Sequence, residues 1–239
     1  MKKKMVIIFI WLLIWQGLSM LVSNDILLAG PYETIKALIS LCGDRLFYFA
    51  IINTQIRIIA GILSAFIFAV SFAALSYKIR LFREFMAPLV SVLKSIPVAS
   101  FVIILLIWAG NKNVSLFICL MVGFPLIYIP LLGALLNLNK GLKELADLYK
   151  MSLLKKIRFM IWPQIKETVI SSLKLAIGMG FKSGIAAELI GQPLNTIGNG
   201  LYRAKVSLET DRLFAWTLVI VLISYLLEKF VIYILRKLS

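Results

Sequence analysis

The sequence contains no histidine and only two cysteines. Histidine is the commonest metal ligand and the usual general base near neutral pH, so its absence argues against a metalloenzyme or an acid–base catalyst. Cys42 and Cys119 stand far apart without metal-site spacing, and Cys119 lies within an apolar run, so we expect no disulfide. The phosphate-binding pattern GxxxxGKS/T is also missing. We therefore expect no catalytic residue, no metal and no cofactor on this chain.

Charged residues are scarce, at 15% of the chain, whereas hydrophobic residues make up 61%. A soluble domain is nearer half apolar and a quarter charged. The apolar residues form runs long enough to cross roughly 30 Å of hydrocarbon as helices, and the short alternating segments of a membrane barrel are missing. The composition predicts an all-α polytopic membrane protein with about six transmembrane helices.

Residues 1–239 are predicted to form a single transmembrane domain. The predicted spans cover about 5–22, 56–76, 85–109, 114–136, 168–190 and 213–235. A hydrophilic insertion, 137–166, separates the fourth and fifth spans, and residues 31–41 have the spacing of an interfacial helix. Residues 2–4 are lysines before an apolar run, as in a signal peptide, but no clear cleavage site follows, so we expect an uncleaved first span.

Basic residues gather on one side of this predicted topology. Six spans place both termini and the insertion on a side that carries fifteen lysines and arginines, against six on the other side. Because basic loops favour the cytoplasmic face, we expect both termini in the cytoplasm. The net charge of +15 follows from this topology, so no nucleic-acid partner is expected.

Two helical patterns fill the stretch 144–163, ELADLYKMSLLKKIRFMIWP, within the insertion. The apolar residues of the first pattern recur at helical spacing between charged ones and are Leu142, Leu145, Ala146, Tyr149 and Leu153. The second pattern has Leu154, Ile157 and Ile161, and Pro163 either ends it or opens the fifth span. The pattern alone leaves two interpretations open: a helix lying on anionic lipid, or a helix that docks a partner.

The same stretch resembles a motif of ABC-importer permeases, E-A-A-x-x-x-G-x9-I-x-L-P. Glu144 and Ala146 match, Leu145 stands in for the middle alanine, and 160–163 (MIWP) follow after nine residues in the motif's register. Lys150 occupies the glycine position and Trp162 the leucine position. The resemblance extends over about residues 30–237. Over this range the chain is similar to the branch of the family that takes up nitrate, sulfonates, taurine and thiamine precursors.

This resemblance implies a type I ABC-importer permease fold and a membrane-spanning subunit of an ATP-driven importer in a bacterial cell membrane. The implied partners are two ABC ATPase subunits that hold ATP and Mg, a second permease copy in a homodimer, and an external solute-binding lipoprotein. The solute would be a sulfonate-, nitrate- or taurine-like anion or a thiamine-precursor-like molecule. The alternative is a secondary transporter or channel without an ATPase, which would have no use for the 144–163 motif.

In the family the motif forms a cytoplasmic coupling helix that docks on the ATPase. The residues that the resemblance assigns to this contact are Glu144, Leu145, Ala146, Asp147, Tyr149, Lys150, Met151, Ser152, Leu153 and Leu154. A glycine suits a left-handed turn, where a lysine costs roughly 1 kcal/mol. We therefore expect a turn that is built differently or shifted to residues 151–152.

Polar residues inside the spans are costly, and these residues and one proline that should kink a span are candidates for the translocation pathway. These candidates are Lys94, Ser95, Pro97, Lys182 and Glu188. Pro97 should kink the third span. Each charged candidate has a structural alternative: Lys94 reaches the headgroups, Lys182 pairs with a carboxylate, and Glu188 makes a structural hydrogen bond.

Small residues mark two further features. Ala176, Gly180 and Gly184 form a stripe that ends at Glu188 and should allow close helix packing. Gly198 and Gly200 lie in a loop that the resemblance makes part of an outer gate. We expect unusual backbone conformations at both glycines, with an ordinary surface loop as the alternative.

Overall fold

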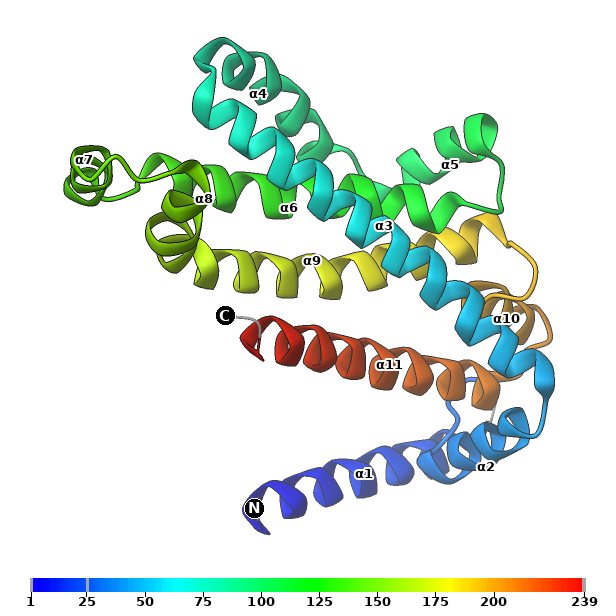
Figure 1. Cartoon of the computed structure of the whole chain (residues 1–239). Helices are drawn as coiled ribbons and strands as arrows, with labels where there is room; N and C mark the ends of the chain where they lie inside the picture. The colour runs from blue at the N-terminus through cyan, green and yellow to red at the C-terminus, as the bar shows by residue number, and fades with distance from the viewer. Residues whose placement is uncertain (1, 25, 238–239) are drawn as a thin grey trace.

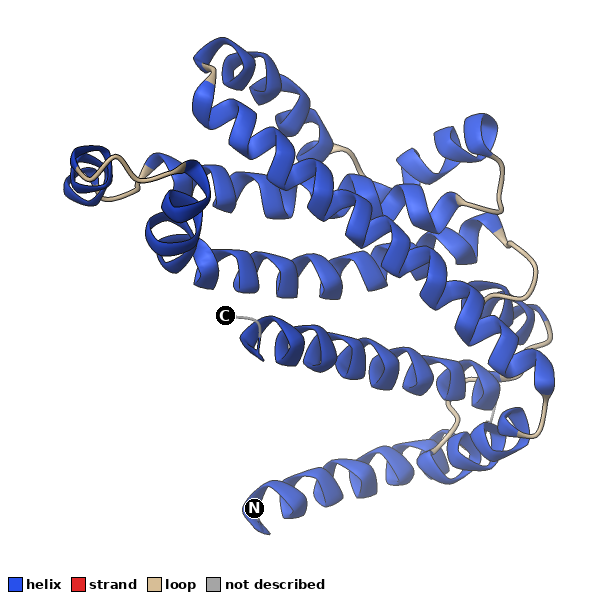
Figure 2. Cartoon of the chain, viewed as in Figure 1, coloured by secondary structure: helices blue, strands red, loops and turns tan. Residues whose placement is uncertain are grey.

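In the computed structural model, residues 2–24 and 26–237 are described. Within these ranges the regular secondary structure is helical and no strand occurs, as the all-α prediction requires (Figures 1 and 2). The helices are α1 (Lys2–Val22), α2 (Pro31–Cys42), α3 (Arg45–Lys78), α4 (Arg80–Ser95), α5 (Val98–Ala109), α6 (Val114–Leu136), α7 (Lys140–Leu148), α8 (Leu153–Lys156), the π-helical turn η1 (Ile157–Ile161), α9 (Trp162–Gly191), α10 (Ile197–Val206) and α11 (Thr210–Lys237).

The core forms where α6 packs against α3 on one side and α9 on the other. Small residues allow this close approach. A Cβ added to Gly184 would lie 2.8 Å from the Cys119 sulfur, and one added to Gly180 would lie 3.2 Å from Ile62. The predicted small-residue stripe of α9 therefore faces α3 and α6, and this prediction is confirmed.

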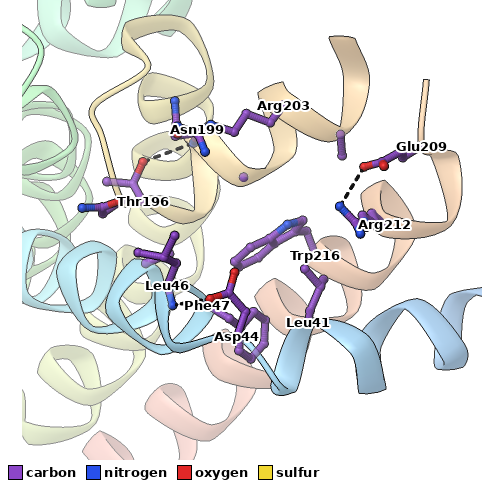
Figure 3. Close-up of a pocket in the computed structure, with 14 residues that line it drawn as sticks. Leu41, Asp44, Leu46, Phe47, Thr196, Asn199, Arg203, Glu209, Arg212 and Trp216 are labelled. Atoms are coloured by element: carbon purple, nitrogen blue, oxygen red, sulfur yellow. Dashed lines mark hydrogen bonds and ion pairs between the residues drawn. The ribbon is translucent and has the colours of Figure 1, made fainter. Parts of the chain in front are cut away.

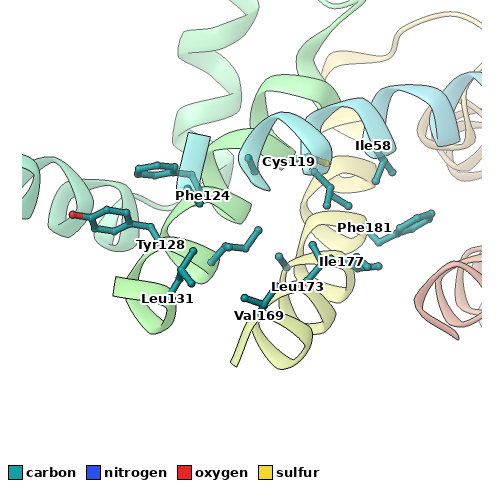
Figure 4. Packing of buried hydrophobic residues seen from close by; sticks show 14 of the residues in the cluster. Ile58, Cys119, Phe124, Tyr128, Leu131, Val169, Leu173, Ile177 and Phe181 are labelled. Carbon is teal, nitrogen blue, oxygen red and sulfur yellow. The ribbon is translucent and has the colours of Figure 1, made fainter. Parts of the chain in front are cut away.

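Around these contacts, large apolar side chains fill the space between the helices. In Figure 4, Phe124 and Tyr128 of α6 point away from α9, and their partners are Phe72 and Ser76 of α3. Leu131 of α6 belongs to the same buried cluster as Val169 and Leu173 of α9. Phe181 and Ile58 are fully buried in the same cluster. The core thus lies between α3, α6 and α9, while α1 and most of α11 leave their apolar surfaces exposed.

The predicted third span, 85–109, is not one helix. It consists of α4 and α5, which meet at an angle of 106°. Pro97 has no N–H and disfavours helical backbone in the residue before it, so Ile96 is extended, with φ −71° and ψ 126°. The predicted kink is confirmed, but it is a full break between two helices.

Two other boundaries differ from the prediction. α3 begins at Arg45 rather than near residue 56, because the Asp44 carboxylate caps it by accepting a hydrogen bond from Leu46 N at 2.9 Å. α9 begins at Trp162 rather than near residue 168, with Pro163 in its first turn. α8, η1 and α9 form one continuous helix, Leu153–Gly191, so Pro163 does not end the second helical pattern and lies just after the π-helical turn, at the start of α9.

The helices alternate between two ends of the bundle. Five of the described helices are long and apolar enough to cross a membrane alone, and the bent α4–α5 pair brings the number to six if it counts as one crossing. Figure 1 shows the two termini and α7 at one end, and α2 and α10 at the other. This arrangement is the one that six crossings require.

Candidate functional site

The segment α7–α8 stands at the end of the bundle that also holds the termini (Figure 1). Asn139 caps α7 by accepting a hydrogen bond from Leu142 N at 3.2 Å. The backbone N–H of Asn139 donates in turn to Gln164 Oε1 at 2.9 Å, which ties α7 to the start of α9. Ala146 is the one buried residue that α7 contributes among those described.

The apolar side chains of this segment are exposed. Leu148 is 78% exposed and Leu154 80%. The other exposed large hydrophobic residues of this segment are Leu142, Leu145, Tyr149 and Leu153. Among the other residues assigned to the ATPase contact, Ala146 is buried and Met151 is half-buried. The rest are exposed, namely Glu144, Asp147, Lys150 and Ser152. Single exposed leucines are ordinary, but this many on one short segment mark an interaction surface.

The predicted amphipathic helix is shorter than its apolar pattern. α7 ends at Leu148, so Tyr149 is its C-cap and Leu153 belongs to α8. The chain leaves the helix through Lys150, whose φ is +46°. Lys150 N donates to the Asp147 carbonyl at 3.0 Å, and Met151 N donates to the Ala146 carbonyl at 3.0 Å.

These two hydrogen bonds form a Schellman motif, with residue 150 in the left-handed position that glycine prefers. The turn is therefore neither built differently nor shifted to residues 151–152, and that expectation is wrong. Two backbone hydrogen bonds offset the cost of about 1 kcal/mol that a non-glycine residue carries in this conformation.

An ion pair holds the two short helices together. Lys156 Nζ of α8 contacts Asp147 Oδ1 in the last turn of α7. The hydrogen bond from Lys156 and its positive charge, with a smaller contribution from Lys143, lower the pKa of Asp147. Asp147 therefore stays ionised, and keeps this pair, to a lower pH than an isolated aspartate.

The lysines of the spans lie on exposed faces. Lys94 and Ser95 line an open groove between α4 and α6, about 490 Å³ in volume, with Tyr128 on its opposite wall. Lys182 lies on the exposed face of α9, above Lys174, whose Nζ is 3.2 Å from Glu228 Oε1 of α11. Within the described residues no carboxylate lies within 4 Å of Lys182, so the predicted alternative of a paired Lys182 has no partner here.

Glu188, in contrast, is fully buried. Its Oε2 accepts a hydrogen bond from Thr54 Oγ1 at 2.8 Å, and its Oε1 accepts one from Ser115 Oγ at 3.1 Å. Gly198 N donates to Oε2 as well, at 3.3 Å. These contacts join α3, α6, α9 and α10, and they favour the structural interpretation of Glu188 over a place in the pathway.

Sequence reasoning missed the partners of Glu188. Thr54 lies between two other polar residues, Asn53 and Gln55, and Ser115 lies at the start of an apolar run, but nothing in their spacing links them to residue 188. Arg57, half-buried on α3 and close enough for its charge to act on Glu188, was also missed. An arginine within an apolar run is itself a signal that could have drawn attention to this region.

The profile of a protein family described as "Binding-protein-dependent transport system inner membrane component" matches residues 57–239. The chain belongs to this family. It is the membrane-spanning permease component of an ABC importer, as the resemblance implied.

Two relatives are similar over long stretches. The taurine transport system permease protein TauC of Escherichia coli is 20% identical over 229 residues, covering 93% of this chain and 82% of TauC. A Bacillus subtilis protein described as an aliphatic sulfonates transport permease, SsuC, is 22% identical over 156 residues, covering 64% of this chain and 56% of SsuC.

At the other end of the permease, the expectation of unusual backbone conformations at the two loop glycines is wrong. Gly198 and Gly200 lie in the helix α10, and neither has a positive φ; Gln192 and Asn195 do, at +49° and +54°. The glycines are needed for close packing instead. A Cβ on Gly198 would overlap the backbone of α9 at Glu188, and one on Gly200 would lie 2.6 Å from the Trp216 ring.

A cavity of about 160 Å³ opens beside α10 (Figure 3). Its walls come from the α2–α3 turn, α10 and the start of α11. Trp216 and Phe47 supply its apolar part, and Asp44, Arg203 and Arg212 supply charge. The sequence did not single out this site, because its residues are far apart in the chain.

The left-handed turn at residue 150 yields a prediction. Lys150→Gly should stabilise the turn by about 1 kcal/mol, because glycine adopts this conformation without strain. Amide hydrogen exchange at residues 150 and 151, whose N–H groups close the Schellman motif, should slow roughly fivefold.

Lys143→Gly is the matched control, since it makes the same substitution inside α7. There glycine costs about 1 kcal/mol, so exchange at the same two amides should become faster. Faster exchange in both variants would show that residue 150 is not held in the left-handed turn.

Proposed function

We propose that the exposed α7–α8 segment docks a separate ATP-hydrolysing subunit, and that two copies of this permease and two such subunits form the importer. The observation that carries the proposal is the group of exposed leucines at Leu145, Leu148, Leu153 and Leu154. In the aqueous phase, a partner that covers these side chains removes apolar surface from water, which lowers the free energy of the complex. In this proposal ATP and Mg bind to that partner. The α7–α8 segment of this chain binds the partner and moves with it.

Docking can be tested at Leu148, which is 78% exposed, so that its removal leaves the permease core intact. Leu148→Ser should reduce the amount of ATPase subunit that co-purifies with the tagged permease at least about tenfold, as expected of a central interface residue. The measurement is quantitative mass spectrometry of the complex purified from native membranes in mild detergent.

Leu194→Ser is the control, because Leu194 is an equally exposed leucine in the α9–α10 loop, at the opposite end of the bundle. It should leave the amount of ATPase unchanged. Equal capture by wild type and Leu148→Ser, or equal loss in both variants, would refute docking through this segment. A stable permease dimer that never captures an ATPase would favour the secondary-transporter alternative.

The orientation follows from the same proposal. The end with α7 and both termini carries most of the basic residues, which is typical of the cytoplasmic face of a membrane protein. The proposed ATPase subunit would bind on that side. The opposite end, with α2 and α10, would then face the external binding lipoprotein that delivers the solute.

Cysteine labelling in intact cells tests this orientation. Ser152→Cys should react with a membrane-impermeant maleimide only after the cells are opened, because Ser152 is exposed in the α7–α8 segment. Cys42 is an internal control, since it is exposed at the other end of the bundle and should react in intact cells. The reverse pattern would invert the proposed topology.

For the solute, we propose a small sulfonate. The two relatives transport taurine and aliphatic sulfonates according to their names. Lys182 supports an anionic solute. A lysine on a membrane-spanning helix costs about 2.5–3.5 kcal/mol unless its face meets water or protein, so Lys182 is expected to face the pathway, where its positive charge attracts an anion. The proposed pathway therefore runs along Lys182 of α9 and along the groove at Lys94, Ser95 and the Pro97 break.

Lys182→Gln should slow sulfonate uptake at least about tenfold, because it removes a charge-assisted hydrogen bond to the passing anion. Lys182→Arg should restore most of the rate. Lys112→Gln, on an exposed lysine in the α5–α6 turn, is the control and should have no effect. Wild-type uptake by Lys182→Gln, with the complex intact, would remove Lys182 from the pathway.

A further inference from the structure

A groove of about 360 Å³ lies between α9 and α11, which run next to each other in Figure 1. Lys174, Gly178 and Lys182 follow one another at intervals of four residues along its α9 wall. A Cβ added to Gly178 would meet no atom within 4 Å, so this glycine leaves the middle of the groove open. The groove therefore has one lysine on each side of an open centre, and α11 adds Glu228 to its lining.

The two lysines of the groove differ in their partners. Lys174 Nζ lies 3.2 Å from Glu228 Oε1, and the side chain of Glu228 is only 26% exposed. Lys182 has no carboxylate within 4 Å among residues 2–24 and 26–237. The lining thus holds two positive charges and one negative charge, which leaves one net positive charge. Because Lys174 is neutralised, this net charge is centred on Lys182.

The ion pair is not needed to join the two helices. Ile223, Leu227 and Val231 of α11 already pack against the buried cluster to which α9 contributes. Ion pairs that water can reach add little to such apolar contacts, and replacing a buried pair by apolar residues is often neutral for stability. The carboxylate of Glu228 does change the charge of the groove, because without it the lining would carry two net positive charges.

We infer that Glu228 is a specificity-determining residue, which limits the solute in this groove to an anion with a single negative charge. Removing an ion from water costs free energy that rises with the square of its charge, whereas its attraction to one lysine rises only in proportion to that charge. A groove with one net positive charge therefore favours a monoanion over a dianion. This inference rests on the proposed anionic solute and on the proposed place of Lys182 in its pathway.

The size of the effect follows from the distance between the two lysines. Residues 174 and 182 are about 12 Å apart along the axis of α9. At about 12 Å and an effective dielectric constant of about 20, one unit charge changes the affinity for a monoanion about tenfold and the affinity for a dianion about a hundredfold. Loss of the Glu228 charge should therefore raise the affinity for a dianion, relative to a monoanion, about tenfold.

Equilibrium binding of radiolabelled sulfate, a dianion, and of radiolabelled ethanesulfonate, a monoanion, tests this assignment. The full-length permease, with the ATPase subunits that co-purify with it, is placed in bilayer nanodiscs of phosphatidylcholine without the external binding protein. Wild type should bind ethanesulfonate saturably and sulfate more weakly. Glu228→Gln should raise the affinity for sulfate about a hundredfold and the affinity for ethanesulfonate about tenfold.

Two further variants separate the charge of the groove from the ion pair itself. Lys174→Gln combined with Glu228→Gln returns the groove to one net positive charge, so it should restore the wild-type preference without restoring the pair. Glu84→Gln is the matched control, because Glu84 also forms an ion pair, with Arg80 Nε at 2.8 Å, but lies on α4 outside the groove. It should leave both affinities unchanged.

An unchanged ratio of the two affinities in Glu228→Gln would overturn the assignment, and so would the absence of saturable binding of either ion to wild type and to Glu228→Gln. Loss of both ions in Glu228→Gln and in the double variant would show that the pair only joins α9 to α11, and the inference would be wrong. Lys182→Gln is assayed alongside. Wild-type binding by Lys182→Gln would refute the proposed pathway, whereas a loss there with no change in Glu228→Gln would refute this inference alone.

Discussion

The carboxylate of Glu188 fixes the relative positions of four helices. A buried carboxylate is stable only if hydrogen-bond donors surround it, and here the donors come from Thr54 of α3, Ser115 of α6 and Gly198 N of α10. A shift of α6 would leave Oε1 unpaired, and a shift of both α3 and α10 would leave Oε2 unpaired, each at a cost of about 1–3 kcal/mol. The close packing of α10 on α9 and the cavity beside it depend on this arrangement.

One helix connects that junction to the other end of the permease. α9 runs without interruption from Trp162, next to the α7–α8 segment, to Gly191, just past Glu188. Its 30 residues span about 45 Å. A displacement at the exposed leucines therefore reaches the Glu188 hydrogen bonds through a single rigid element, whose exposed face also carries Lys182.

The sequence predicted well what depends on local pattern. Hydropathy located the spans, Pro97 located the break between α4 and α5, and the small residues of α9 located its packing face. Prediction from the sequence failed where contacts between distant segments determine the conformation or the role of a residue. Lys150 adopts a glycine conformation because two backbone hydrogen bonds hold it there, and Gly198 is required by a neighbouring helix rather than by its own turn. The partners of Glu188 and the residues that line the cavity beside α10 come from distant segments that no spacing connects.

The π-helical turn Ile157–Ile161 sets the direction in which the exposed leucines of α7 and α8 face. Trp162 N–H bonds the carbonyl of Ile157, five residues back, so this turn holds one residue more than an α-helical turn. Each residue of a helix advances the chain by about 100° around its axis. The extra residue therefore sets the rotation of the segment before it. Without it, α8 and the residues that precede it would be rotated by about a quarter turn around the axis of α9, and the exposed leucines would face a different direction.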